Sequence, residues 1–241
     1  GALAWRSGLP ARLTEAVQER IVAASAEAGL AVARVTVEGR VNATPAEVLA
    51  ASGLAQGMPM LGFSPDGVRA RLEALAWVER ASVQRRFPGH VHLVIEERAP
   101  FALWQNHGRF AVIDRAGRVI LRDTVARFAS LPLVVGEGAA PEAATLLGVL
   151  AEYPEVRRRA TAAVRVNGRR WNLRLASGAD VLLPEGHEAA ALERLVALHR
   201  ETQVLDRQLV AVDLRLPDRM VLRPVPAEQP PAPREPPQRR S

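Results

Sequence analysis

Few side chains in this 241-residue sequence have the type and spacing that catalysis or metal binding requires. His90 and His92 lie two residues apart in an alternating stretch, which places both on one face of a strand. A metal site would need a third ligand and an ordered second shell, and His107 falls in a later turn. Glu96 and Glu97 are adjacent, so a strand directs them to opposite faces. We therefore interpret the histidines as surface residues and the glutamates as surface pairing groups, with no metal site and no acid–base pair.

No other catalytic grouping emerges from the sequence. There is no cysteine, which excludes disulfides, thiolate-ligated metal and cysteine nucleophiles. The sequence contains no Gly-x-Ser-x-Gly, no phosphate-binding glycine loop and no His-Glu-x-x-His. We expect a chain that is not an enzyme, needs no cofactor and serves as a binding scaffold.

Charge and hydropathy narrow the range of partners. The formal net charge is +6, but arginines and acidic residues are interspersed and aromatic residues make up only 4%. Such a composition is too poor in stacking groups for nucleic acid, so we expect a solvated basic surface and no nucleic-acid partner. No run of 18 apolar residues is present. The short apolar start, Gly1 to Trp5 followed by Arg6, fits the end of a membrane-spanning helix, although five residues alone do not decide it.

An alternating stretch, residues 77–104, organises the first half of the chain. It predicts two strands, of which the second buries Val91, Leu93 and Ile95. Between the strands, Phe87-Pro88-Gly89-His90 predicts a type II turn, with glycine at positive φ. Pro100 then ends the hairpin, since proline cannot donate to a ladder.

The residues before this hairpin predict a strand and two helices. Residues 31–38 alternate as a strand. Thr44, Pro45 and Glu47 form a capping box that starts one helix, and Ser64 with Pro65 starts the next. An earlier helical pattern covers residues 11–28. The order strand, helix, helix, strand, strand predicts a two-layer module with both helices on one sheet face.

After Pro100 the pattern changes to short strands separated by turn residues, with two helices at residues 142–152 and 188–200. The fold class is therefore α+β: a β-α-α-β-β module followed by a mostly antiparallel β domain. The expected strands of that domain are residues 101–105, 110–114, 119–122, 133–135, 160–166, 170–175, 180–183, 209–216 and 220–222.

The last strand has the character of a protected sheet edge. Arg215, Arg219 and Arg223 flank it and prolines follow it directly. Charges and proline prevent indiscriminate pairing while leaving backbone groups for a chosen partner. The remaining residues, 225–241, are rich in proline and charge, and we expect them to be disordered.

Several segments, in order and spacing, resemble one family. They are VTVEGR at 35–40, LEALAWV at 72–78, VQRRFP at 83–88, EERAPFALW at 96–104 and DRAGRVI at 114–120. Together they are similar to the bacterial cell-division family FtsQ/DivIB, of the proteobacterial kind, over roughly residues 30–224. The resemblance implies a membrane-proximal segment with a juxtamembrane helix at 1–31, a POTRA domain at 32–100, the family's β domain at 101–224 and a tail at 225–241.

The same resemblance implies location, role and partners. Family members are single-pass proteins of the bacterial inner membrane, with the bulk of the chain in the periplasm at the division septum. The implied role is an essential, non-enzymatic scaffold that links early (FtsK) and late (FtsB/FtsL) division proteins and helps to control septal cell-wall assembly. FtsK and other division proteins would bind through the POTRA domain, and the missing N-terminal span would enter the membrane.

The resemblance also assigns partner-binding residues. The FtsB/FtsL complex would add a strand along the terminal strand. A basic residue before the tryptophan of the meander, the three strands expected at 160–166, 170–175 and 180–183, would contact FtsB. The residues implied are Leu216, Arg219, Met220, Val221, Leu222, Arg223, Arg169, Arg170 and Trp171. An alternative is a POTRA-containing component of outer-membrane assembly or secretion. Such proteins continue into a long transmembrane barrel, for which the residues after Pro100 are too few.

Overall fold

The computed structural model describes residues 20, 22, 24, 25, 27 and 29–226. The chain divides into two compact units, residues 1–100 with 119–124 and residues 101–118 with 125–241. The domain boundaries drawn from the sequence stay predictions.

The predictions for the two ends of the chain fall mostly outside the described residues. The apolar start at Gly1 lies outside them, and so does most of the tail at 225–241. Of the helix predicted at 11–28, the described residues 20, 22, 24, 25 and 27 are helical.

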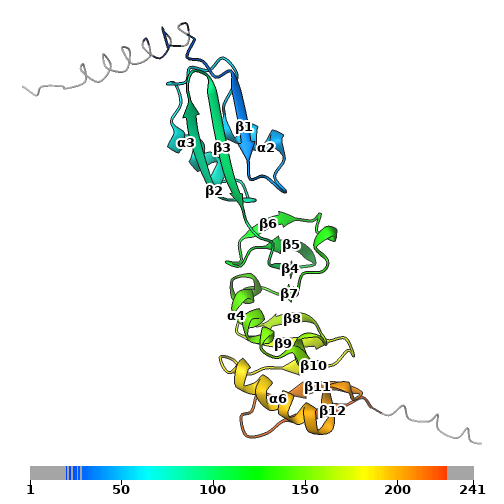
Figure 1. Ribbon diagram of the computed structural model, residues 1–241. Helices are drawn as coiled ribbons and strands as arrows, with labels where there is room; N and C mark the ends of the chain where they lie inside the picture. Colours follow the sequence, from blue (N-terminus) through cyan, green and yellow to red (C-terminus); the bar gives the residue numbers. More distant parts are fainter. Residues whose placement is uncertain (1–19, 21, 23, 26, 28, 227–241) are drawn as a thin grey trace, which may run out of the picture. The chain divides into compact units, whose positions relative to one another are not determined.

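The first unit has the predicted order of strand, helix, helix, strand, strand. Its three-stranded sheet has the order β1-β3-β2, with β1 parallel and β2 antiparallel to the central β3 (Figure 1). The elements are β1 (Arg34–Glu38), α2 (Pro45–Ser52), α3 (Pro65–Glu73), β2 (Val78–Arg86) and β3 (His90–Glu97).

Both helices begin where their capping residues predict. The Thr44 side chain accepts the N–H of Glu47, and the Glu47 carboxylate accepts the N–H of Thr44 at 2.9 Å, so the capping box is complete. Ser64 likewise accepts the N–H of Gly67. These bonds satisfy N–H groups that lack helical partners, which fixes the helix starts locally.

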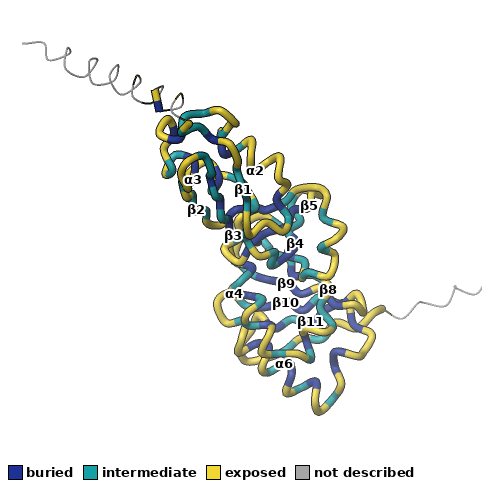
Figure 2. Tube along the Cα trace, turned by 45° about the horizontal axis from the view of Figure 1, so that its top comes forward, coloured by how far each residue is buried: buried dark blue, intermediate teal, exposed yellow. Residues whose placement is uncertain are grey.

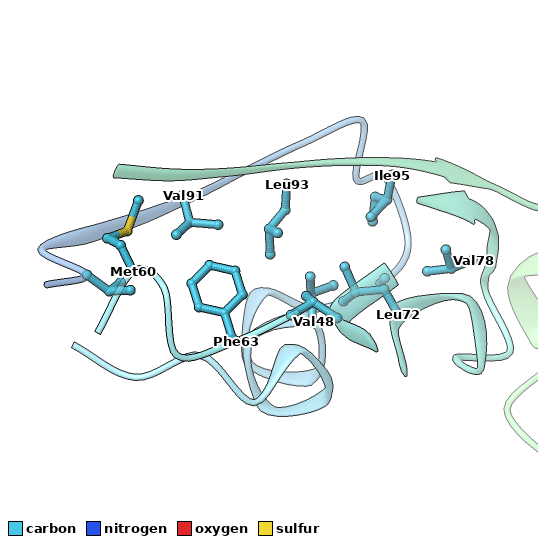
Figure 3. Close-up of a cluster of buried hydrophobic side chains, with 11 residues drawn as sticks. Val48, Met60, Phe63, Leu72, Val78, Val91, Leu93 and Ile95 are labelled. Atoms are coloured by element: carbon cyan, nitrogen blue, oxygen red, sulfur yellow. The ribbon is translucent and has the colours of Figure 1, made fainter. Parts of the chain in front are cut away.

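The core of the first unit lies between the helices and one sheet face. Val91, Leu93 and Ile95 of β3 are at most 2% exposed, as their alternation predicts. Figure 3 shows them facing Val48 of α2 and Leu72 of α3. Full burial of each such side chain stabilises the fold by about 1.5–3 kcal/mol.

The turn between β2 and β3 differs from the type II turn that we predicted. The Phe87–Pro88 peptide bond is cis, and Gly89 does not have a positive φ. Glycine is needed at position 89 for space instead: a Cβ there would lie 2.6 Å from the carbonyl oxygen of Ala31. The sequence pattern could not reveal this contact, because Ala31 is 58 positions away along the chain.

The second sheet has nine strands in the order β12-β11-β10-β9-β8-β7-β4-β5-β6 (Figure 1). Its strands are β4 (Ala102–Asn106), β5 (Arg109–Ile113), β6 (Val119–Arg122), β7 (Leu133–Val135), β8 (Ala160–Val166), β9 (Arg170–Leu175), β10 (Asp180–Leu182), β11 (Leu209–Asp213) and β12 (Val221–Pro224). The helical segments are η1 (Ala126–Phe128), α4 (Ala139–Ala151), α5 (Pro154–Arg157), α6 (Glu188–Thr202) and η2 (Val204–Asp206). The fold class is α+β, as predicted.

Three details of the second unit differ from the predicted boundaries. Helix α4 starts at Ala139 rather than residue 142, because Gly138 adopts the left-handed conformation just before it. A short additional helix, α5, begins at Pro154. Strand β11 ends at Asp213, three residues before the predicted end. That early end shapes the loop that leads into β12.

Alternation along the middle strands separates two faces of this sheet. On β9, Trp171, Leu173 and Leu175 are buried, whereas Asn172 and Arg174 are more exposed. In Figure 2, buried segments run through β9 and β10. The layer of α4 and α6 buries its own apolar stripes, and the two helices contact each other.

Candidate partner-binding edge of the second sheet

Strand β12 is the outermost strand of the nine-stranded sheet on its side. It pairs antiparallel with β11, with Val221 opposite Asp213, Leu222 opposite Val212 and Arg223 opposite Ala211. No second neighbour of β12 is found among residues 29–226. One row of its backbone groups is therefore available for pairing.

The direction of each backbone N–H follows from one hydrogen bond beyond the strand. Val225 donates its N–H to the carbonyl oxygen of Gln208 at the long distance of 3.5 Å. Because N–H directions alternate along an extended strand, those of Arg223 and Val221 also face β11. The N–H of Leu222 then faces outward. Pro224 occupies the next outward position, where its missing N–H costs the sheet no bond.

Exposed apolar side chains gather around this edge. Leu216, Val221 and Val225 are 50%, 41% and 51% exposed, and Val210 at the irregularity in β11 is 47% exposed. Soluble proteins rarely leave several large apolar residues together on one surface without a use. The edge can therefore offer both backbone hydrogen bonds and apolar contacts.

The loop before β12 is held by charged contacts. The Asp213 carboxylate accepts from Arg215 Nε at 2.8 Å and from the Arg215 N–H at 3.1 Å. The pKa of Asp213 is lowered, chiefly by the hydrogen bond from the Arg215 side chain. The effect of this bond on the pKa exceeds the opposite effect of burial. Arg194 of α6 donates to the carbonyl oxygens of Leu216 and Pro217. These contacts fix the path of the chain into the edge strand.

The predicted residues of the terminal strand lie at this edge. Arg219 and Arg223 are exposed, while Met220 and Leu222 are half-buried. Arg219 pairs with Asp218 at 3.0 Å, and an Arg223 nitrogen lies 4.0 Å from Asp213. The register places Leu222 in one row with buried Val212, so its side chain faces the core side.

The predicted residues of the meander lie three strands away at the same end of the sheet. Asn172, Leu182, Asp213 and Val221 form one row across β9 to β12. Strands β9 and β12 run in the same direction. Arg170, just before Asn172, and Met220, just before Val221, therefore lie at the same end of the sheet. Three strand spacings separate them by about 14 Å.

The three meander residues have different exposures. Arg169 is exposed in the β8–β9 turn, and Arg170 is half-buried at the start of β9. Trp171 is 2% exposed, and the guanidinium of Arg165 lies 4.9 Å from its ring centroid. Trp171 is therefore placed to hold the turn in position rather than to meet a partner directly.

Sequence reasoning missed four residues of this edge. Val210 is hidden in the apolar run of residues 209–212, whose continuity gives no sign of an exposed position. Val225 lies in the segment assigned to the tail. Arg194 acts on the loop through contacts across 20 or more positions, as in its bond to Leu214, and Asp213 acts on it through Arg215, a pairing that its place after an apolar run does not reveal. Only Val225 had a local signal, since it is the one large apolar residue after Pro224.

The histidines and glutamates singled out first belong to the other unit. Thr36 Oγ1 lies 2.8 Å from His90 Nε2 and 2.9 Å from His92 Nδ1. Glu96 pairs with Arg80 across the strands, as a surface group. Within the described part of the chain, no group of three or more histidine, aspartate or glutamate residues could hold a metal ion.

Glu97 is not the surface pairing group that we expected. Its carboxylate accepts the backbone N–H groups of Val41, Asn42 and Ala43 at 2.8–2.9 Å. Burial alone would raise the pKa of Glu97, but these hydrogen bonds outweigh it and lower the pKa. A glutamate at a strand end gives no local sign of this role, because the bonded loop lies more than 50 residues earlier.

Comparisons with known proteins match both units. Residues 30–98 match the model of the POTRA domain, FtsQ-type, and residues 102–215 match that of cell division protein FtsQ/DivIB, C-terminal. The cell division protein FtsQ of Rhizobium radiobacter is 40% identical over 178 residues, which cover 73% of this chain and 84% of that protein. The chain belongs to the FtsQ/DivIB family. The resemblance that the sequence motifs suggested is thereby confirmed.

Other relatives in the family are longer than this chain. FtsQ of Bradyrhizobium diazoefficiens is 43% identical, covering 81% of the chain and 57% of that protein. FtsQ of Caulobacter vibrioides is 42% identical, covering 83% and 66%. The chain thus spans 57–66% of the length of these two relatives.

One solved family structure is also similar. It is the major extracytoplasmic domain of DivIB from Geobacillus stearothermophilus, at 19% identity and a TM-score of 0.32, covering 45% of this chain and 96% of that one. This likeness is too weak to support an argument. Among the described residues, no helix has the length and hydropathy needed to cross a bilayer.

Proposed function

We propose that this chain is the periplasmic part of a single-pass inner-membrane protein and acts as a non-enzymatic scaffold of the division machinery. In this proposal it links FtsK, bound through the POTRA domain, to the FtsB/FtsL complex at the septum and helps to control septal cell-wall assembly. Membership of a cell-division family supports the setting. The observation that carries the specific role is the unpaired outer side of β12.

In this proposal a strand of FtsB adds to β12 as a tenth strand of the sheet. Leu222 offers an outward N–H, and exposed Val221 and Leu216 offer apolar contacts. Main-chain hydrogen bonds give such additions their affinity, and side-chain contacts give specificity. Of the three predicted arginines, Arg219 lies closest to the added strand, whereas Arg169 and Arg170, at the same end of the sheet but three strands inside β12, would meet a part of FtsB outside that strand.

Pro224 limits where the added strand can pair. It removes an outward donor at the end of β12, so the partner's ladder must end there. The prolines that follow have the same effect. The edge is thus open to a short strand in one register and closed to extended, indiscriminate pairing.

The matched pair Leu222→Pro and Leu222→Ala tests this function. Both variants lose the leucine side chain, but only proline removes the outward N–H. We expect Leu222→Pro to weaken binding of the purified FtsB/FtsL complex by at least about tenfold, because a ladder bond is lost and the ring obstructs the partner strand. Leu222→Ala should lose much less. Affinities are measured by calorimetry.

Two results would contradict the proposal. Equal affinities for the two variants would show that the backbone edge is not used. If the Leu222→Pro variant binds the FtsB/FtsL complex as tightly as the wild-type chain does, the binding site lies elsewhere. Circular dichroism of each variant checks that the second unit remains folded.

A further inference from the structure

A second candidate binding surface lies on the helix-free face of the sheet in the first unit. Arg34 of β1, His90 of β3 and Arg86 of β2 stand in one row across the three strands. Neighbouring strands are about 4.8 Å apart, so two guanidinium groups flank one imidazole within about 10 Å.

The two arginines of this row have no carboxylate partner among the described residues. Arg86 donates to the amide oxygen of Gln84 at 3.0 Å. Among residues 29–226, neither Arg34 nor Arg86 forms an ion pair with a carboxylate. Burial, followed by the charges of Arg34, Arg86 and His92, lowers the pKa of His90. The row therefore has the electrostatics of an anion site that no carboxylate of the described residues occupies.

Charge changes sign along the same sheet face. The next row, Thr36, His92 and Gln84, carries no full charge when His92 is neutral. Beyond it, Glu38 lies 3.3 Å from His92 Nε2, and Glu96 pairs with Arg80 at 2.8 Å. The unpaired arginines are thus confined to the end of the sheet where β2 turns into β3.

Exposed apolar side chains flank this basic end. Phe87, in the turn between β2 and β3, is 57% exposed. Leu61, which is 42% exposed, lies two residues after Pro59, whose bridge to Ala31 places this loop at the same end of the unit as the turn. An aromatic ring and an aliphatic side chain next to arginines suit a bilayer interface, where the apolar groups enter below the phosphates.

The chain also enters the first unit at this end. The N–H groups of Ala33 and Arg34 donate to the carbonyl oxygen of Gly89 at 2.7 and 3.1 Å. The chain therefore enters β1 beside the basic row. In the proposed function the residues before β1 connect to the membrane, so the following inference rests on that function.

We propose that Arg34, Arg86 and His90, with Phe87 and Leu61, form a docking surface for the phosphate groups of an anionic phospholipid bilayer. The surface holds the first unit against the membrane from which the chain emerges. Arginine suits this task, since its planar group donates two hydrogen bonds to one phosphate. Anionic lipid attracts each such arginine independently of any protein partner.

Vesicle co-sedimentation of the full chain tests the docking surface. Wild-type chain should bind vesicles of phosphatidylglycerol mixed with phosphatidylcholine, and the double variant Arg34→Gln/Arg86→Gln should bind them at least about tenfold more weakly. The matched control is Arg69→Gln/Arg158→Gln, which removes the same charge elsewhere: Arg69 pairs with Asp66 on α3, and Arg158 is exposed in the second unit. The control should bind like wild type.

Two further measurements make the outcome decisive. Phe87→Ser should weaken vesicle binding without changing net charge. The imidazole pKa of His90, followed by NMR, should rise with anionic vesicles but not with inorganic phosphate at the same phosphate concentration. As a folding control, the double variant should unfold at the same temperature as wild type, because neither arginine has a carboxylate partner among residues 29–226 to lose.

Three results would overturn the inference. They are vesicle binding by the double variant equal to wild type, an equal loss in the control, and a response of His90 to inorganic phosphate alone. None of these bears on β12. Affinity for the FtsB/FtsL complex, measured on the same double variant, should stay unchanged, so failure of the docking surface and failure of the scaffold proposal are told apart.

Discussion

At the scale of single residues, the most informative groups are those whose partners lie far away in the chain. Glu97 ties the end of β3 to the loop between β1 and α2 through three consecutive backbone N–H groups. A carboxylate that accepts several backbone bonds favours its charged form. Glu97 is therefore a structural residue of the first unit, although its sequence context suggests a solvated surface group.

Glu97→Gln should destabilise the first unit by about 1–2 kcal/mol, because charge-assisted bonds become neutral ones. The folded-state pKa of Glu97 is lowered, so its contribution is present above the unfolded pKa of about 4.3 and is lost as pH falls through the folded value. Urea unfolding at neutral and acidic pH measures this. The difference between variant and wild type should shrink at acidic pH; a constant difference would contradict the assignment.

At the scale of elements, the sequence correctly predicted the features that depend on residues close together in the chain. The capping residues Thr44 and Ser64 gave correct helix starts, and alternation gave the buried face of β3. The turn at Phe87 to His90 was predicted wrongly, because the packing of Gly89 against Ala31 is a long-range contact. The exposure of Val210 was likewise invisible, since it depends on an irregularity in the pairing of β11 with β12.

Two glycine substitutions test where the fold requires a residue without a Cβ. Gly89→Ala should destabilise the first unit by about 1–3 kcal/mol, because the new Cβ would lie 2.6 Å from a backbone oxygen. Gly148→Ala in α4 meets nothing within 4 Å and should stabilise the second unit by about 0.5–1 kcal/mol. Thermal unfolding of the full chain measures both. A tolerated Gly89→Ala would mean that the close approach to Ala31 is not rigid.

At the scale of the whole molecule, each unit presents one surface that has no partner among the described residues. The first unit carries an unneutralised basic row beside exposed Phe87. The second ends in a strand with one open side. Sequence motifs identified the family and the terminal strand, whereas the basic row required the register of three strands. A scaffold needs surfaces of this kind rather than a catalytic site.

The central claim is that the outer side of β12 accepts a strand from FtsB, and amide hydrogen exchange at Leu222 tests it most directly. Free chain should exchange the outward N–H of Leu222 rapidly while the N–H of Val221, which faces β11, is protected. On binding the FtsB/FtsL complex, exchange at Leu222 should slow by at least about tenfold, with little change at Val221. Binding that leaves exchange at Leu222 as fast as in the free chain would contradict the account.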